Sequence, residues 1–330
     1  MLQPRKATID LQKGANYSDK SSKLRASRAE KHEKHLNPMQ SLLIKALLNS
    51  FAILPLWLSR QFGSLIGSYH IIARSGPYRV TEENIARCYP KMAEEERQLL
   101  VQKSLAETGK MATEVAAIWT RPWSWVERKI LKVHGEDKLM AAIEAPEGLI
   151  LLTPHIGNWE ILGPYVSQLT DMTALYQPPK LPAMDSFIRE SRERMGATLV
   201  PTDRRGVSAL LKALKKGGLT IILPDQVADG GSQHAPFFGH PAQTMTLVSN
   251  LLNRTGAKVL MCLPLRVRGG FEIHVVEPEE AIYSEDLATS LAAMNLSIEK
   301  GITLAPAQYQ WEYKRFRRPP EGQPKPYVFK

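Results

Sequence analysis

Short runs of apolar residues recur along the C-terminal half of the chain, and within each run the apolar positions are continuous rather than alternating with polar ones. The runs cover residues 148–153, 172–177, 197–201, 219–224, 258–267 and 271–277. Continuous apolar strands separated by helical segments are typical of a sheet that is covered on both faces. The pattern therefore predicts one α/β domain with a mainly parallel or mixed central sheet flanked by helices. Gly269 and Gly270 predict a hairpin between the last two strands.

The region before these strands has a different pattern. Residues 92–119 have the apolar spacing of a helix, with glutamates in its first turn. Residues 39–73 are apolar nearly all round, and Lys45, Pro55 and Arg60 interrupt them. Because the cleanest apolar run is shorter than the roughly 20 residues that cross a bilayer as a helix, a kinked or interfacial membrane-anchor helix is predicted as readily as a full span. A helical hairpin packed on the globular domain is the alternative.

Residues 1–38 are polar and basic, with almost no aromatic side chains. Such a composition predicts a disordered basic tail, and it lacks the apolar core of a secretory signal. Met39 follows directly, so the natural start of the protein is hypothesised to lie there, which the intact mass of the native protein would test. The chain is thus divided into the tail, the membrane-anchor segment 39–73 and an α/β domain over 74–330.

The charge of the chain points to anionic partners. The formal net charge is +10 and the isoelectric point is about 9.5, which suits nucleic acid, an acidic membrane surface or an acidic protein. Nucleic acid is disfavoured because no recognition motif accompanies the charge. The only cysteines, Cys88 and Cys262, form no disulfide framework or zinc pattern, so a reducing, cytosol-facing compartment is expected.

The stretch "LLTPHIGNWE", residues 151–160, holds the first candidate chemistry. Pro154 ends an apolar strand and places His155 at the edge of the sheet where ligands bind, and Asn158 can cap the helix that follows. On one regular helix His155 and Glu160 would face apart, so they meet only if His155 lies before the helix. The carboxylate would then orient the imidazole as a general base. A structural histidine and a glutamate that favours the helix N-terminus remain open, and no second histidine at ligand spacing supports a zinc site.

Further polar groups follow in the same domain. Arg189, Arg192 and Arg194 crowd one segment, and guanidinium groups suit phosphate or sugar-acid groups, although a solvated helix face is the alternative. Asp225 ends a strand at the ligand-binding edge, where it positions an arginine or the substrate, or simply forms a turn.

Two C-terminal features have similarly open interpretations. Phe237 and Phe238 lie between turn residues, where they either line an apolar channel for a substrate chain or anchor the loop to the core. A basic run near the C-terminus suits lipid phosphates or an acidic protein, or is an idle solvated segment. It comprises Lys314, Arg315, Arg317 and Arg318.

"HIGNWE" resembles the His-x4-Asp/Glu motif of the glycerolipid acyltransferase superfamily, and specifically its lipid A secondary acyltransferase branch. Other blocks of that family agree in order. They are "FIRESRERMGATLVP" with Arg192 at its most characteristic position, "RRGVSALLKALKKGGLTIILPDQVADGG" with "APFFGHPAQT", and "PAQYQWEYKRFRRPPEG". The resemblance runs from about residue 40 to the end and excludes the basic tail. "WEYKRF" departs from the commoner Trp-x-His-Arg-Arg-Phe, which leaves the role of Tyr313 open.

The resemblance implies a fold similar to glycerol-3-phosphate acyltransferase, and transfer of a fatty acyl chain from acyl carrier protein to a hydroxyl of a 3-hydroxyacyl chain on a lipid A precursor. It implies that His155 removes the hydroxyl proton, that Glu160 holds the His155 tautomer, and that Arg192 contacts the acceptor or the oxyanion. Neither a covalent acyl-enzyme nor a cofactor or metal is expected. The implied location is the bacterial inner membrane, with the catalytic domain facing the cytoplasm. The remaining substrate-binding candidates are Arg189, Asp225, Asn158, Phe237 and Phe238.

Three other functions stay open at this point. An acyltransferase acting on another glycolipid or on a lysophospholipid would share His155 and Glu160. A thioesterase would use a similar base to activate water, and would release fatty acid without a lipid hydroxyl. A non-catalytic basic peripheral-membrane module would bind lipid unchanged after His155→Ala and show no turnover.

Overall fold

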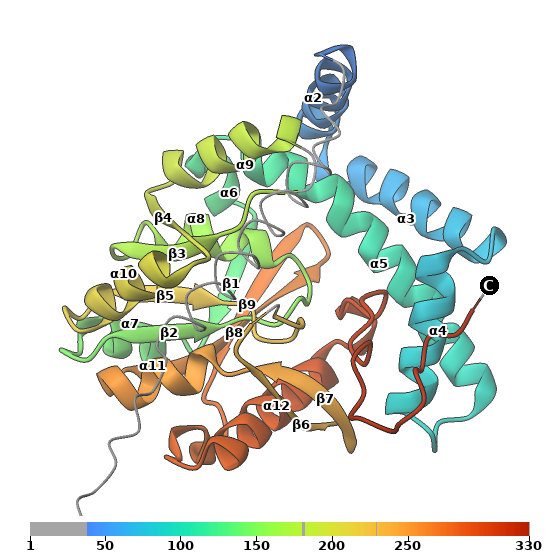
Figure 1. Cartoon of the computed structure of the whole chain (residues 1–330). Coiled ribbons are helices and arrows are strands. Elements are labelled where there is room, and N and C mark those ends of the chain that lie inside the picture. Colours follow the sequence, from blue (N-terminus) through green and yellow to red (C-terminus); the bar gives the residue numbers. More distant parts are fainter. Residues whose placement is uncertain (1–37, 180–181, 229, 330) are drawn as a thin grey trace, which may run out of the picture.

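A mixed sheet lies at the centre of the protein, with helices packed on both of its faces (Figure 1). The computed structural model describes residues 38–179, 182–228 and 230–329. The predicted tail therefore lies, apart from residue 38, outside the described residues. Within them, the central sheet has seven strands in the order β1-β9-β8-β2-β5-β3-β4. The prediction of an α/β fold with a mixed sheet is confirmed.

The elements have the following bounds. The strands of the central sheet are β1 (Ile130–His134), β2 (Leu149–Leu152), β3 (Met172–Tyr176), β4 (Ala197–Pro201), β5 (Leu219–Ile222), β8 (Lys258–Val267) and β9 (Gly270–Val276), and a separate hairpin is formed by β6 (Ser232–Phe237) and β7 (His240–Met245). The helices are α2 (Pro38–Ile53), α3 (Leu56–Ile72), α4 (Gly76–Cys88), α5 (Glu94–Thr120), α6 (Trp123–Glu127), α7 (Glu136–Glu144), α8 (Leu162–Val166), α9 (Pro182–Arg194), α10 (Arg204–Leu214), α11 (Leu247–Thr255) and α12 (Leu287–Leu304). Short 3₁₀ turns are η1 (Trp159–Ile161), η2 (Glu280–Tyr283) and η3 (Pro306–Gln308).

The middle of the sheet explains why its strands are continuously apolar. β2 pairs in parallel with both β5 and β8, and all four of its side chains are buried. Ile150 and Leu152 pack in a core with α10, α11 and α12, whereas Leu149 and Leu151 pack in a second core with α7 and α8. Successive side chains of a strand point to opposite faces, so a strand covered on both sides has to be apolar at every position.

The sheet architecture confirms one prediction from the sequence and adds two features that the sequence analysis did not predict. β8 and β9 form the predicted antiparallel hairpin. The edge strand β1 pairs in parallel with β9 and was not predicted, because its residues are only partly buried and it lacks a continuous apolar run. The β6–β7 hairpin was also missed, since Pro236 and Pro241 lie opposite each other within it and proline is unfavourable in a strand.

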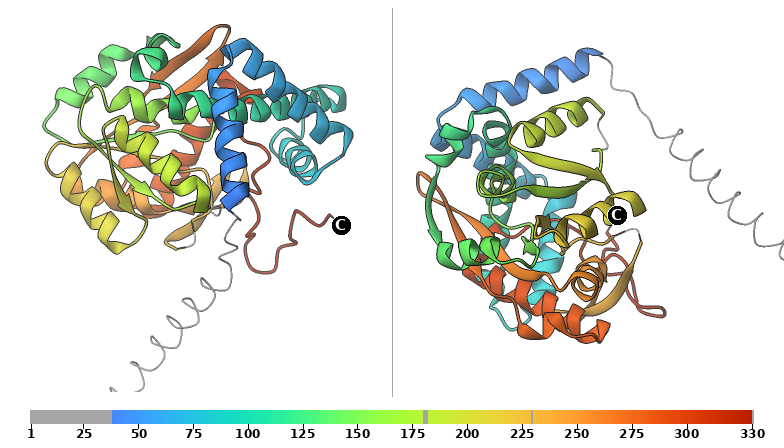
Figure 2. Two further views of the ribbon diagram at one scale, coloured as in Figure 1. Left: turned by 90° about the horizontal axis from the view of Figure 1, so that it is seen from above. Right: turned by 90° about the vertical axis from the view of Figure 1, so that its left-hand side faces the viewer.

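The apolar segment 39–73 forms two helices that are separated next to Pro55. α3 packs along α5, and its glycines allow the two backbones to approach closely: a Cβ atom on Gly63 would lie 2.5 Å from the carbonyl oxygen of Gly109. α2 lies on the outside of the domain next to α9 (Figure 2). Among the described residues, no helix is long and apolar enough to cross a membrane.

Candidate active site

His155 lies on the turn that follows β2, and Asp225 lies on the turn that follows β5. Because β2 and β5 are parallel neighbours, their carboxyl ends meet at one edge of the sheet and bring the two residues together. The Asp225 carboxylate accepts a hydrogen bond from the backbone N–H of His155 at 2.9 Å and from Nδ1–H of its ring at 2.7 Å. The side chain of Asp225 is 2% exposed and that of His155 is 14% exposed.

This contact fixes which nitrogen of the imidazole can act as a base. With Nδ1 donating to Asp225, the lone pair of the neutral ring is on Nε2. Burial by itself would raise the pKa of Asp225, but the adjacent His155 and its hydrogen bonds hold that pKa below its ordinary value. The carboxylate therefore stays charged and can stabilise the imidazolium that forms when Nε2 takes a proton.

Glu160 does not make the contact expected of it. Its carboxylate accepts hydrogen bonds from the indole N–H of Trp119 at 2.9 Å and from Nη2 of Arg192 at 2.8 Å. Glu160 belongs to the 3₁₀ turn that follows His155, where both its oxygens are held by side chains of α5 and α9. The residue that orients His155 is thus Asp225, and the expectation that Glu160 holds the tautomer is corrected.

The three arginines of the α9 region have separate environments. Arg192 pairs with Glu160, and its guanidinium group also lies 5.7 Å from the ring centre of Tyr176. Arg189 is about half exposed, and its guanidinium group lies 5.3 Å from the centre of the same ring. Arg194 donates to backbone carbonyls at the end of α5. Of the three, only Arg192 faces the cavity next to His155.

A cavity of about 230 Å³ opens beside the histidine. Its polar side is formed by His155, Glu160 and Arg192, with the rings of Trp119 and Trp159. The rest of the wall is mainly apolar and comes from α8, α9, β3, β4, β5 and the residues next to them. That part consists of Gly163, Pro164, Met172, Ala174, Leu175, Ser191, Ala197, Leu199, Ile221 and Leu223. The cavity thus combines a base, a charged pair and an apolar compartment.

Asn158 ties the turn after β2 to α5 rather than capping a helix. Its side-chain amide donates to Glu114 at 3.1 Å, and no capping hydrogen bond is formed by its side chain. Glu114 is fully buried on α5 and is paired with Arg266 and Arg60. Gly157 has a φ of +60°, and a Cβ atom there would lie 2.0 Å from the carbonyl oxygen of Pro264. The prediction that Gly157 serves a close backbone approach is confirmed.

Phe237 and Phe238 do not reach the cavity. Phe237 is 1% exposed and belongs to the core beneath α12. Phe238 adopts a left-handed φ of 49° and packs edge-on against Tyr89 and at a tilt against Trp311. Of the two interpretations of these residues, the structure therefore supports the loop anchor and not the acyl channel.

The C-terminal block contacts both the turn after β2 and the turn after β5, and the sequence analysis did not predict these contacts. The backbone N–H of Gln310 donates to the carbonyl oxygen of His155 at 2.9 Å, and Ile156 forms a β-bridge with Tyr309. The Tyr313 hydroxyl accepts a hydrogen bond from the backbone N–H of Val227, two residues after Asp225. The family signature at the C-terminus was visible in the sequence, but its contact with both turns depends on the fold.

The basic run is only partly at the surface. Arg315 is 3% exposed and donates to the carbonyl oxygen of Gln243 and to the hydroxyl of Thr244, so it is a structural residue. Arg317 donates to the carbonyl oxygen of Val227.

Cys88 and Cys262 are free and buried, and burial raises the pKa of Cys262 to about 12, so neither thiol is an accessible nucleophile.

Comparison with known proteins identifies the family of the chain. Residues 27–318 match the family described as bacterial lipid A biosynthesis acyltransferase. The chain is 30% identical over 287 residues to the lipid A biosynthesis palmitoleoyltransferase of Escherichia coli (strain K12), covering 84% of this chain and 92% of the relative. It is 28% identical over 256 residues to the lipid A biosynthesis lauroyltransferase of the same organism, covering 76% and 82%.

A solved structure, the 1-acyl-sn-glycerophosphate (LPA) acyltransferase of Thermotoga maritima, aligns with a TM-score of 0.34 and 15% identity, over 76% of this chain and 97% of that one. That likeness is too low to support an argument about substrate or mechanism. The family match covers most of the chain and includes the turns that carry His155 and Asp225 and the C-terminal block that contacts them. The chain therefore belongs to the bacterial lipid A biosynthesis acyltransferase family, and it is an acyltransferase.

Proposed function

We propose that this enzyme transfers a fatty acyl chain from an acyl carrier protein thioester to the hydroxyl of a 3-hydroxyacyl chain on a lipid A precursor, with His155 as the general base. The observation that carries the proposal is the hydrogen bond from His155 Nδ1 to the buried carboxylate of Asp225, next to a largely apolar cavity. That bond leaves Nε2 as the basic nitrogen for the acceptor hydroxyl.

The reaction then needs no covalent acyl-enzyme. Nε2 of His155 removes the hydroxyl proton while the hydroxyl oxygen attacks the thioester carbonyl carbon. The resulting tetrahedral oxyanion collapses, the carbon–sulfur bond breaks, and the leaving thiolate takes the proton from the imidazolium. Asp225 stabilises the imidazolium throughout. General-base assistance of this kind contributes about 10²–10⁴-fold in rate.

The lining of the cavity indicates which part receives the acyl chain and which part receives the charged groups. The side formed by β3, β4, β5 and α8 is mainly apolar and suits the hydrocarbon chain of the donor. The pair of Arg192 and Glu160 stands at the polar side, close to the base. A guanidinium group there suits the developing oxyanion or an anionic group of the acceptor, and Glu160 holds Arg192 in place. Arg189, on the same helix, is more exposed and suits a peripheral contact with the acceptor.

The exposed surface of the two N-terminal helices supports a location at the bilayer. Large apolar side chains are exposed there although each helix belongs to the folded protein. They are Leu47, Ile53, Trp57, Phe62, Leu65, Ile66, Tyr69 and Ile72. Such a surface suits insertion into the interfacial layer of a membrane, and α2 adjoins α9, which carries Arg192. We place the enzyme at the cytoplasmic face of the bacterial inner membrane, where a lipid acceptor reaches the site from the bilayer.

An acyl-transfer assay in detergent tests the proposed substrates. It would supply acyl carrier protein thioester with a radiolabelled chain, together with a tetraacylated lipid A precursor that bears sugar acids, and compare the wild type with His155→Ala. Labelled lipid from the wild type, and a roughly hundredfold or larger loss in the variant, is expected. Transfer to a lysophospholipid in preference would reassign the acceptor, and release of free fatty acid without an acceptor would replace the proposal by a thioesterase.

A further inference from the structure

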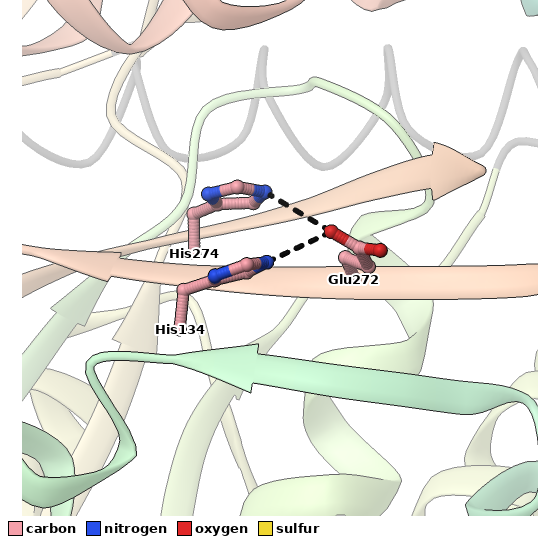
Figure 3. A group of neighbouring side chains, drawn as sticks. All are labelled: His134, Glu272 and His274. Atoms are coloured by element: carbon pink, nitrogen blue, oxygen red, sulfur yellow. Dashed lines mark hydrogen bonds and ion pairs between the residues drawn. The ribbon is translucent and has the colours of Figure 1, made fainter.

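Two histidines and a glutamate converge at the edge of the sheet, outside the active site (Figure 3). Nε2 of His134 lies 2.8 Å from Oε2 of Glu272, and Nε2 of His274 lies 3.9 Å from the same oxygen. The two imidazole rings are stacked, with their centres 4.3 Å apart and 17° between their planes. Each of the three residues offers a ligand atom within 4.8 Å of the others.

The register of the strands creates this arrangement. His134 is paired directly with His274 across the parallel strands β1 and β9, and Glu272 precedes His274 by two residues on β9. Residues two apart on one strand share a face of the sheet, so all three side chains project from the same side. A register irregularity between Ile130 and Lys132 sets which residues of β1 face that side. The convergence is thus built into the backbone and does not depend on long flexible side chains.

These groups have the chemistry of a zinc site. Imidazole nitrogen and carboxylate oxygen are both ligands of Zn²⁺, at about 2.0–2.2 Å, and three protein ligands with one water complete a tetrahedral shell. Tetrahedral ligands at such distances are separated by about 3.3 Å. Side-chain rotations that shift the atoms by about an ångström would bring the three to that spacing. All three side chains are about one-third exposed, which leaves them room to rotate and leaves a coordination position open to water.

We infer that His134, Glu272 and His274 bind a divalent transition-metal ion of the zinc class, and that the ion ties the edge strand β1 to β9. β8 separates β9 from β2, the strand that precedes His155, and none of the three residues lines the cavity beside His155, so we assign this site no part in acyl transfer. β1 has no neighbour on its outer side within the described sheet. A metal ion that binds both strands binds only the folded protein, and it therefore stabilises the folded state.

One neighbouring charge provides a matched control. Lys132 lies on β1 opposite Glu272, on the face that carries the three ligands. Its ammonium group lowers the electrostatic attraction of the site for a cation but donates no electron pair while protonated. Replacing Lys132 therefore perturbs the same strand and face without removing a ligand, and the site should keep or increase its affinity.

The test is equilibrium dialysis of Zn²⁺ against the untagged full chain, with Co²⁺ absorption in the visible region as a second probe. Wild type is compared with His134→Ala, Glu272→Gln, His274→Ala and Lys132→Ala. The histidines of residues 1–37 are present in every protein compared, so ions bound there cancel. The wild type and Lys132→Ala should each bind one equivalent of Zn²⁺ at this site, and each ligand variant should bind that equivalent at least tenfold more weakly. Zn²⁺ should raise the thermal unfolding midpoint of the wild type and of Lys132→Ala, but not that of the ligand variants. Equal binding by wild type and the ligand variants would overturn the inference. Loss of the Zn²⁺ equivalent in Lys132→Ala would also overturn it, because the loss in the ligand variants could then come from disturbing the strand rather than from removing a ligand.

Discussion

The carboxylate of Asp225 accepts both the backbone N–H and the Nδ1–H of His155, at 2.9 and 2.7 Å. One buried side chain thereby fixes the position of the turn and the tautomer of the ring. Glu160, which is much nearer in sequence, is turned away and pairs with Arg192. The site thus contains two separate charged pairs, Asp225 with the proposed base His155 and Glu160 with Arg192 at the cavity wall. Each pair has its own measurable consequence.

The pairing of Glu160 with Arg192 predicts that their substitutions are not additive. Glu160→Gln removes the charge that holds the guanidinium group, and Arg192→Gln removes the group itself. Since the two act as one unit, the double variant should lose little more activity than the worse single variant, with a coupling energy of about 0.5–3 kcal/mol. The rates of acyl transfer of the four proteins measure this. If the two losses multiply, the residues act independently and the pair is not the functional unit.

The close approach at Gly157 predicts that even one methyl group there disturbs the catalytic turn. Gly157→Ala forces a residue with φ near +60° to carry a Cβ atom that would lie 2.0 Å from Pro264 O. The turn must shift, and a displacement of about an ångström costs roughly a hundredfold in rate. Gly76→Ala is the matched control, because no atom lies within 4 Å of its Cβ position. Activity and thermal unfolding of both variants are compared, and an active Gly157→Ala enzyme would argue against the tight turn.

The buried carboxylate of Glu114 predicts a pH dependence of stability. Burial alone would raise its pKa, but Arg266 and Arg60 outweigh burial and hold the pKa below the ordinary value of 4.5. Because the folded-state pKa is the lower one, this stabilisation is fully present above the unfolded value and is lost as the pH falls through the folded value. Glu114→Gln should cost about 3–5 kcal/mol at pH 7, since it takes from Arg60 the carboxylate with which it is paired and leaves Arg266 with Glu107 alone.

Denaturant unfolding of wild type and Glu114→Gln between pH 7 and pH 3 measures the Glu114 contribution. The difference between the two proteins should shrink toward the acid end. A constant difference over that range would mean that the charge of Glu114 does not supply the stability. Glu96→Gln is the control, because Glu96 is an exposed carboxylate in the first turn of the same helix.

The apolar surface of α3 predicts which side chains make the proposed contact with the bilayer. Leu65→Glu with Ile72→Glu places two charges where the side chains are 64% and 84% exposed. Each buried apolar side chain of this size contributes about 1.5–3 kcal/mol on leaving water, so co-flotation with anionic liposomes should fall by at least about tenfold. Leu99→Glu, an exposed leucine on α5, should leave flotation unchanged. Equal flotation of all three proteins would remove α3 from the membrane contact.

The fold was more accessible from the sequence than the site. β2 and β8 were recognised because burial on both faces requires an apolar residue at nearly every position. β1 escaped because an edge strand with solvent on one side carries no such run. The role of Asp225 was inaccessible for a different reason. It lies 70 residues from His155, and only the adjacency of β2 and β5, which no local pattern encodes, brings the two together.

Local patterns also misled at particular residues. Glu160 is close to His155 in sequence, yet a 3₁₀ turn directs it to Trp119 and Arg192. Arg315 belongs to a basic run that is typical of a solvent-exposed segment, but its guanidinium group is buried and donates to the carbonyl oxygen of Gln243. In both cases a tertiary partner decides the environment of the side chain. Spacing along the chain alone could not identify that partner.

The most direct test of the account is the rate of acyl transfer in a single turnover by Asp225→Asn. The amide keeps the size of the side chain but loses the charge that fixes the His155 tautomer and stabilises its imidazolium. We expect the rate constant to fall by about 10²–10⁴-fold, in a protein whose thermal unfolding shows that it is still folded. A folded Asp225→Asn protein that transfers the acyl chain at the wild-type rate would contradict the assignment of Asp225 as the partner of the catalytic histidine.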